Sequence, residues 1–209
     1  MYLYTTVESN SEYSFVEKRS EFIGHCAPVS DELSATAFVE SIRKKYSDAR
    51  HNVYAYNLRE GNISRYSDDG EPHGTAGVPV LDVIRKAGVT DCCIVVTRYF
   101  GGVLLGTGGL LRAYTAAAAG ALESAGVAKV GLYNVYSCVM SYTDYQKLMP
   151  LIASLGAEIA ESEFSESVRL CVPVLADAGE RFVLAVTDCT NGRVKPTKTG
   201  EKRDFIRKL

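Results

Sequence analysis

The sequence lacks the features that carry a chain into or across a membrane. No apolar run approaches the roughly 18 residues that a membrane span needs. The first fifteen residues, MYLYTTVESNSEYSF, contain neither the basic segment nor the apolar segment of a secretory signal peptide. We therefore expect a cytoplasmic protein without a membrane partner.

The cysteines lack the spacing of a metal site. No C-x-x-C pair occurs, and most of the six cysteines lie in apolar runs, which is typical of buried, reduced thiols in a cytosolic protein. We expect no metal bound through them and no cofactor. The cysteines are Cys26, Cys92, Cys93, Cys138, Cys171 and Cys189.

The chain also lacks a strong net charge. Its 23 basic and 25 acidic residues leave −2, which argues against a strong, non-specific DNA binder. The charge is uneven, however. Residues 193–209 hold seven basic and two acidic residues, or +5, whereas residues 131–192 hold three and eight, or −5. A basic tail attracts nucleic acid or an acidic partner, or is simply solvated.

The 209 residues suit one large or two small soluble domains. Strand and helix patterns alternate as far as residue 126. From Leu132 the order becomes strand, helix, strand, strand, helix, with a last strand near residues 194–199, which is the split βαβ ferredoxin-like order. We therefore predict an α+β fold of two domains, residues 1–130 and 131–209.

Two helices of the first domain carry specific expectations. The first has an apolar stripe and a cap at Ser30 or Asp31. The second spans 108–125, with Thr107 as its N-cap, Gly126 at its end, and alanines that allow close approach to a sheet. The stripe of the first helix is Leu33, Phe38, Ile42 and Tyr46, and the apolar face of the second includes Leu110, Leu111, Tyr114, Ala117, Ala118, Ala121 and Leu122.

The chain is organised around residues 97–114, TRYFGGVLLGTGGLLRAY. A buried strand at 92–96 enters this glycine-rich loop, which leads into the second helix. Free backbone N–H groups and the helix dipole favour an anion at such a helix start. Arg98 and Arg112 flank the loop and could close on that anion. Alternatively, the glycines only let strand and helix pack closely. They are Gly101, Gly102, Gly106, Gly108 and Gly109.

The loop matches neither common phosphate-binding motif. No Gly-Lys-Ser/Thr follows the glycines, which excludes a Walker A loop. No G-x-G-x-x-G fits in the frame that a dinucleotide site requires, with an acidic residue about 20 positions on. An anion site here would therefore be of another type.

A second polar stretch, SDDGEPHGTAG at 67–77, reads as a loop. Four interpretations remain open. Its acids bind Mg²⁺, or pair with Arg50, Arg98 or Arg112, or perform acid–base chemistry with His73, or the loop is structural and held by Asx-type turns. The residues are Asp68, Asp69, Glu71 and His73.

Three stretches closely resemble the signature of the IMPACT/YigZ family: HNVYAY at 51–56, RYSDDGEPHGTAG at 65–77 and VVTRYFGGVLLGTGGLLRAY at 95–114. The resemblance covers nearly the whole chain. It implies an N-terminal IMPACT domain, similar in fold to domains of a small-subunit ribosomal protein and of elongation factor G. It also implies a ferredoxin-like C-terminal domain similar to the last domain of that factor. Eukaryotic IMPACT proteins regulate translation, and for bacterial members the resemblance implies a nucleic-acid- or ribosome-linked role.

The leading hypothesis is an RNA- or ribosome-binding protein linked to regulation of translation, with a further protein partner in translation as one alternative. Tyr54, Tyr56, Tyr66, Tyr99 and Phe100 offer stacking faces. Competing hypotheses are a protein-interaction module without chemistry and an enzyme acting on a phosphorylated small molecule, with His51 or His73 moving the proton. The expected anion- or nucleic-acid-binding residues are Arg50, His51, Arg65, Arg98, Tyr99, Gly101, Gly102, Gly108, Gly109 and Arg112.

Overall fold

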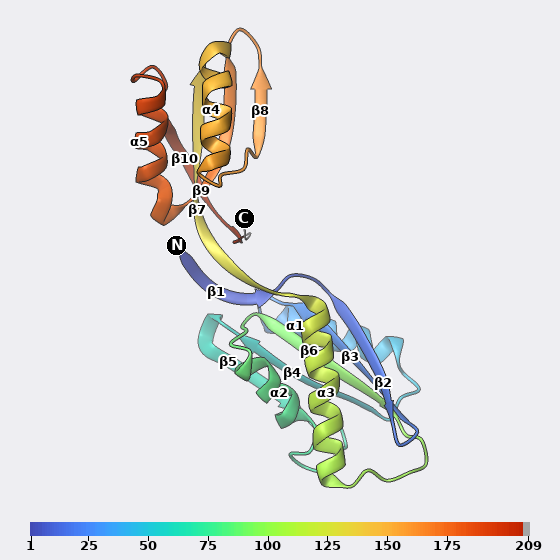
Figure 1. Ribbon diagram of the computed structural model, residues 1–209. Coiled ribbons are helices and arrows are strands. Elements are labelled where there is room, and N and C mark those ends of the chain that lie inside the picture. The colour runs from blue at the N-terminus through green and yellow to red at the C-terminus, as the bar shows by residue number, and fades with distance from the viewer. Residues whose placement is uncertain (207–209) are drawn as a thin grey trace. The chain divides into compact units, whose positions relative to one another are not determined.

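The computed structural model describes residues 1–206, which fold into two compact units (Figure 1). The first unit is Tyr4–Ala128, and the second combines Met1–Leu3 with Lys129–Leu209. The division expected from the sequence placed Met1–Leu3 with the first domain. These residues belong to the second unit because β1 (Tyr2–Val7) pairs with β7 (Val127–Met140).

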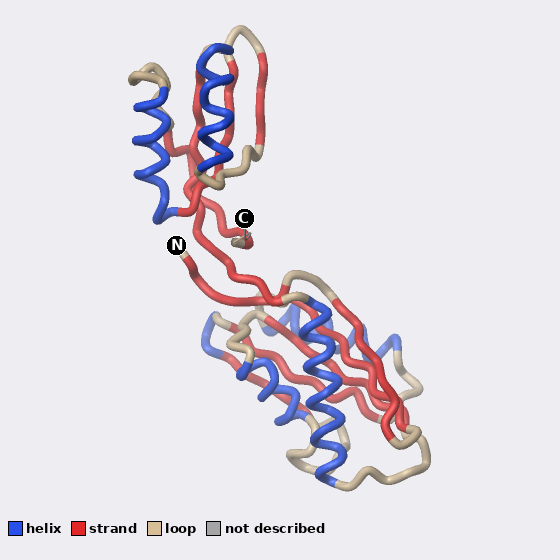
Figure 2. The backbone as a smooth tube through the Cα atoms, in the orientation of Figure 1, coloured by secondary structure: helices blue, strands red, loops and turns tan. Residues whose placement is uncertain are grey.

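The first unit is built on a five-stranded sheet with the strand order β2-β3-β6-β4-β5, in which every pairing is antiparallel. The central strand β6 buries seven consecutive residues because helices cover both faces of the sheet (Figure 2). The strands are β2 (Ser11–Glu17), β3 (Ser20–Pro28), β4 (His51–Leu58), β5 (Ile63–Ser67) and β6 (Cys92–Tyr99).

Helices α2 (Gly77–Lys86) and α3 (Thr107–Ala125) pack on one face of this sheet, and α1 (Glu32–Lys45) packs on the other. The alanines of α3 bring its backbone close to β3, as predicted. Gly24 of β3 lies directly under the Ala117 carbonyl, and Gly120 of α3 lies against the ring of Tyr13. Small residues on both elements therefore set the spacing between helix and sheet.

Several local predictions are confirmed and others are wrong. Asp31 caps α1, its carboxylate accepting from the Ser34 N–H. Leu33 is 82% exposed, however, because the buried stripe of α1 is Ala35, Val39 and Ile42.

At the start of α3, the N-cap is Gly106 in place of Thr107. Its φ of 73° lies in the left-handed region that favours glycine. Leu111, placed on the apolar face by its sequence, is exposed, because the buried face of α3 at this point is formed by Leu110, Ala113 and Tyr114.

The second unit has the ferredoxin-like order that the sequence predicts, with the strands arranged β10-β7-β9-β8. Its helices cover one face only, so β9 alternates buried and less buried residues. The last strand runs from residue 197 to 205, so it overlaps the predicted 194–199 but starts later and extends further; Val194 is buried in the core before the strand begins. The remaining elements are α4 (Tyr142–Ser154), β8 (Glu161–Phe164), β9 (Val168–Leu175), α5 (Gly179–Cys189) and β10 (Thr197–Phe205).

Two short 3₁₀ turns, Glu60–Asn62 and Ala176–Ala178, complete the elements. Across residues 1–206, none of the helices has the length and apolarity needed to span a membrane.

The close approach of α3 to β3 generates a stability prediction. In Gly24→Ala, the new Cβ would overlap the Ala117 carbonyl, so we expect the free energy of unfolding to fall by about 1–3 kcal/mol. Urea unfolding measures this change. The control is Gly108→Ala, whose Cβ would meet only Arg112 Nη1 at 3.7 Å. Equal effects of the two substitutions would contradict the packing argument.

Candidate functional site

One end of the first unit's sheet carries a row of three facing side chains. Register places Phe22 of β3 and His51 of β4 on either side of Arg98 of β6. The Arg98 guanidinium lies 5.5 Å from the ring centroids of both Phe22 and Phe100. A cation is thus held between two aromatic rings at the point where β6 enters the glycine-rich loop.

A single carboxylate, that of Glu71, closes this row. Its Oε1 accepts from Arg98 Nη1 at 2.6 Å and from the Tyr114 hydroxyl of α3 at 2.7 Å. His51 Nε2 lies 4.0 Å from the same oxygen. Arg98 and Glu71 are both buried. Burial, and then the Glu71 carboxylate, raise the pKa of the Tyr114 hydroxyl far above its ordinary value, so that it remains a donor.

Asp68 is also committed to the fold. Its carboxylate accepts from the backbone N–H groups of Gly74, Ala76 and Gly77 at 2.9, 3.1 and 2.7 Å, at the start of α2. Burial raises the pKa of Asp68, but these N–H groups lower it by more, and the net pKa lies below its ordinary value. His73 Nδ1 lies 3.7 Å from Asp68, with a side chain that is 94% exposed.

Asp69 joins the loop to two other elements. Its carboxylate accepts from the Asn52 backbone N–H at 2.6 Å and from Arg43 Nη2 of α1 at 2.9 Å. Its carbonyl lies 2.8 Å from His51 Nδ1. Because a carbonyl only accepts, Nδ1 carries the proton and donates. This places the other ring nitrogen toward Glu71.

These contacts show which partners the acidic loop has in this structure. Glu71 pairs with Arg98, one of the three arginines expected from the sequence, while Asp68 forms backbone caps of the Asx type. The three carboxylates turn to different partners, and no cluster of metal-ligating side chains occurs within residues 1–206. In this structure the carboxylates of the acidic loop join it to β4, β6 and three helices.

The glycine-rich loop is anchored at both ends but exposed between them. Gly101 lies against the Arg19 backbone, with no room for a Cβ, and its N–H donates to Ser20 Oγ at 3.2 Å. Leu105 is buried beneath Gly109. Between these anchors, Leu104 is 82% exposed. The loop is therefore a fixed projection that presents side chains to solvent.

Cationic groups surround this projection. Lys18 and Arg19 form the β2–β3 turn, both with positive φ, and Arg112 Nη1 lies over the first turn of α3 beside Gly108. That turn has no side-chain cap and no acidic residue. No ion pair joins these three side chains to any described residue. Repulsion between Arg112 and the positive helix end favours an anion there.

The residues expected at the anion site do not all converge. Gly101, Gly102, Gly108, Gly109 and Arg112 lie in or beside the projection, and the exposed Arg50 directly precedes β4 at the same end of the sheet. Arg98 and His51 instead belong to the buried cluster, the group of side chains around the Glu71 carboxylate.

Two further residues expected at the anion site, Tyr99 and Arg65, lie apart from the cations around the glycine-rich loop. The Tyr99 hydroxyl donates to Asp48 at 2.7 Å, and Arg65 lines a separate hollow on β5. Among the proposed stacking residues, Tyr56 is buried in the core under α1.

Lys18, Arg19 and Arg43 were missed by sequence reasoning. The β2–β3 turn has Lys18 and Arg19 at its positive-φ positions, where glycine or asparagine would have marked a turn in the sequence. Only the long-range pairing of strands brings this turn to the glycine-rich loop.

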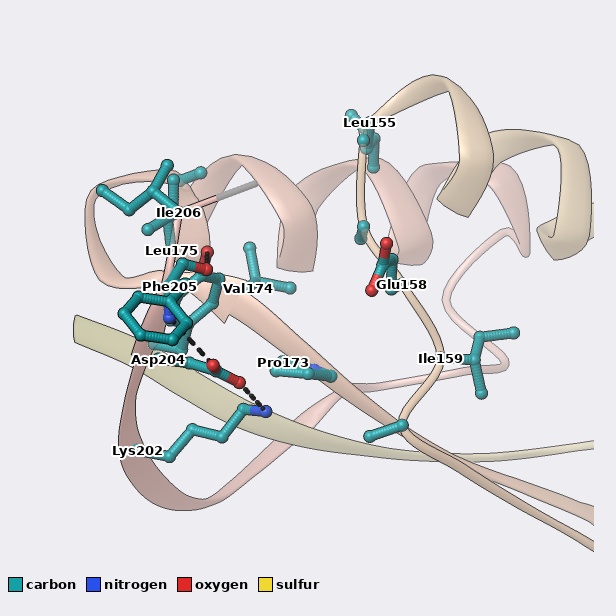
Figure 3. Close-up of a pocket in the computed structure, with 15 residues that line it drawn as sticks. Leu155, Glu158, Ile159, Pro173, Val174, Leu175, Lys202, Asp204, Phe205 and Ile206 are labelled. Atoms are coloured by element: carbon teal, nitrogen blue, oxygen red, sulfur yellow. Dashed lines mark hydrogen bonds and ion pairs between the residues drawn. The ribbon is translucent and has the colours of Figure 1, made fainter. Parts of the chain in front are cut away.

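The second unit contains an apolar hollow of about 340 Å³, which includes Leu155, Ile159, Leu175 and Phe205 (Figure 3). β8 extends along β9 only as far as Ala160, whose N–H donates to the Cys171 carbonyl. Pro173, the next β9 residue facing that edge, has no N–H to offer, and the chain turns away there. A Lys202–Asp204 ion pair of 2.8 Å borders the hollow.

The buried cluster generates a prediction about charge. Glu71→Gln leaves the Arg98 guanidinium buried without a counter-charge, and we expect a loss of about 3–5 kcal/mol in the free energy of unfolding. Glu40→Gln removes the same charge from the exposed Arg43 pair, and its loss should stay below about 1 kcal/mol. Urea unfolding of both variants at neutral pH makes the comparison. A Glu71→Gln protein as stable as the control would refute the role of the pair.

The Asp68 cap generates a pH prediction. Because the folded pKa is lowered, the cap stabilises the fold above the unfolded pKa, and this contribution is lost as pH falls through the folded pKa. The stability deficit of Asp68→Asn relative to wild type should therefore shrink between about pH 5 and pH 2. Unfolding free energies measured across this range test it, with the exposed Asp188→Asn as a control for net charge. A deficit independent of pH would contradict it.

Comparison with known proteins gives a consistent result over both units. The model of the Impact N-terminal domain matches residues 18–122, and that of a domain of unknown function, DUF1949, matches residues 138–193. A crystal structure described as that of a hypothetical protein superimposes with a TM-score of 0.60 at 30% identity, covering 96% of this chain and 98% of the other.

Relatives extend from bacteria to eukaryotes. IMPACT family member YvyE of Bacillus subtilis is 37% identical over 96% of this chain and 93% of its own length. IMPACT family member YigZ of Escherichia coli is 34% identical over 85% of this chain and 89% of its own. The Protein IMPACT homolog of Dictyostelium discoideum is 40% identical over 44% of this chain and 28% of its own length. With two family models and near full-length relatives in agreement, the chain belongs to the IMPACT family.

Proposed function

We propose that this protein binds RNA, free or within the ribosome, and acts in the regulation of translation. The binding surface is the tip surface, defined as Lys18, Arg19, Arg50, Phe100 and Arg112 around the glycine-rich loop. The eukaryotic IMPACT proteins, whose translational role motivates the second half of the proposal, resemble this chain over 43–44% of its length.

The observation that carries the proposal is the meeting of unpaired cations with an exposed aromatic ring. Phe100 is 47% exposed, and its neighbour Gly101 lies against Arg19 of the β2–β3 turn. Arginine and lysine bind backbone phosphates, and an exposed ring stacks on an unpaired base. The uncapped amides at the start of α3 add further donors for a phosphate.

The buried cluster supports this role by holding the surface still. Arg98 precedes the glycine-rich loop and Tyr114 follows it, and both donate to one Glu71 oxygen. A loop fixed at both ends loses little conformational entropy when it binds. The acids of the neighbouring loop are turned to their own partners, which keeps most of their charge away from an incoming phosphate.

A protein-interaction module is the second candidate, and one observation favours it. Val103 and Leu104 project from the tip, and Leu111 is exposed beside them. Aliphatic side chains contribute little to base stacking, whereas an exposed apolar group with a polar rim is typical of protein contacts. A ribonucleoprotein target would engage both sets of residues.

Binding of fluorescent single-stranded RNA, followed by anisotropy at low and moderate salt, tests the proposal. Wild type should bind with a salt-dependent affinity, and Arg19→Ala/Arg112→Ala should weaken binding about tenfold or more, since each phosphate contact contributes. Phe100→Ala should weaken binding by about 1–3 kcal/mol through lost stacking.

The matched control is Arg181→Ala/Arg203→Ala, which removes the same charge from exposed arginines of the second unit. Equal losses in both double variants would place RNA elsewhere and overturn the tip surface. If free RNA does not bind, co-sedimentation with ribosomes is measured with the same variants. Absence of both interactions would leave the protein-interaction candidate standing.

A further inference from the structure

A second cationic site lies in the first unit, away from the tip surface. A polar hollow of about 530 Å³ forms where the end of β4, the start of β5 and the end of α2 meet. Arg65 and Arg85 both line it, and no carboxylate-bearing residue does. We call it the arginine hollow. The uncharged polar side chains around it are Asn57, Asn62, Ser64 and Thr90.

Hydrogen bonds fix the floor of the arginine hollow. Ser64 Oγ lies 2.8 Å from Asn57 Oδ1, to which it donates, and Asn57 Nδ2 donates to the Val89 carbonyl at 2.9 Å. Thr90 is tied to Thr5 through both its backbone N–H and its hydroxyl. The two strands and the α2–β6 connection are thereby held in one arrangement before any ligand arrives.

The end of α2 does not need Arg85 as a cap. The N–H groups of Ala87, Gly88 and Val89 already bond to carbonyls of the last turn, with Gly88 at φ 65° in the left-handed region. Arg85 is exposed and makes no ion pair with any residue from 1 to 206. Its guanidinium is therefore available to a ligand.

Arg65 is oriented but only partly neutralised. Its Nε lies 3.6 Å from Glu32 Oε1, an oxygen that also accepts from the Tyr56 hydroxyl. Its Nη1 donates to its neighbour's carbonyl, that of Ser64, at 3.4 Å. Glu32 holds one edge of the guanidinium at the rim, so the Arg65 fork does not have to be ordered by the ligand.

We propose that the arginine hollow binds a phosphate-bearing small molecule, with a pyrophosphate or phosphomonoester group between Arg65 and Arg85. Two arginine forks suit the tetrahedral oxygens of phosphate, which accept bidentate hydrogen bonds. Asn62 and Ser64 add uncharged partners for the remaining oxygens. The site shares no residue with the tip surface, so its existence does not depend on RNA binding.

The test is a titration of the full chain with pyrophosphate, followed by heteronuclear NMR. We expect saturable shifts at the amides of Ser64, Arg65, Gly88 and Thr90, stronger for pyrophosphate than for inorganic phosphate. Arg85→Ala should weaken the affinity about tenfold or more, equivalent to about 1.4 kcal/mol, and Arg65→Ala/Arg85→Ala should abolish saturation.

Lys86→Ala is the matched control, because it removes one exposed charge beside Arg85 from a side chain that does not line the hollow. The variant spectra report folding directly. Shifts that map to the tip surface, or an affinity lowered equally by Lys86→Ala and Arg85→Ala, would overturn the proposal. So would the absence of any saturable shift with pyrophosphate.

Discussion

The first unit depends on one buried carboxylate. Glu71 receives hydrogen bonds from Arg98 at the end of β6 and from Tyr114 in α3. Burying a guanidinium is costly unless a counter-charge lies in contact with it, so β6 and the acidic loop can only close together. Because Arg98 and Tyr114 stand on either side of the glycine-rich loop, the same oxygen also fixes both ends of that loop.

The other contacts of the acidic loop hold it in the position that brings Glu71 to Arg98 and Tyr114. Asp68 satisfies the exposed N–H groups at the start of α2, and Asp69 ties the loop to β4 and α1. Asp69, Gly70 and Gly74 all have positive φ, a backbone shape that such side-chain bonds offset. In this structure the stretch therefore links the sheet to the helices that pack on it. The two proposals rest on the exposed cations around the tip surface and in the arginine hollow.

The two units bury their cores differently. The first unit covers both faces of its sheet and gathers its polar interior at one end. The second unit covers one face, and it has a mostly apolar hollow where Pro173 interrupts strand pairing. We therefore assign the proposed recognition of phosphate groups to the first unit.

The sequence by itself determined the elements and their order, because apolar periodicity and turn residues act over short distances. It predicted the ferredoxin-like second unit, a cap at Ser30 or Asp31, and the alanine contact of α3 with the sheet. It named Glu71, Arg98, His51 and Tyr114, and it offered pairing of the loop's acids with Arg98 as one of four open interpretations. Only the tertiary structure shows that Arg98 pairs with Glu71. Only strand register brought Lys18 and Arg19 to the glycine-rich loop, since their partners lie some 80 residues away in the chain. Such pairings depend on how the strands and helices pack in three dimensions, and apolar periodicity and turn residues do not report long-range packing.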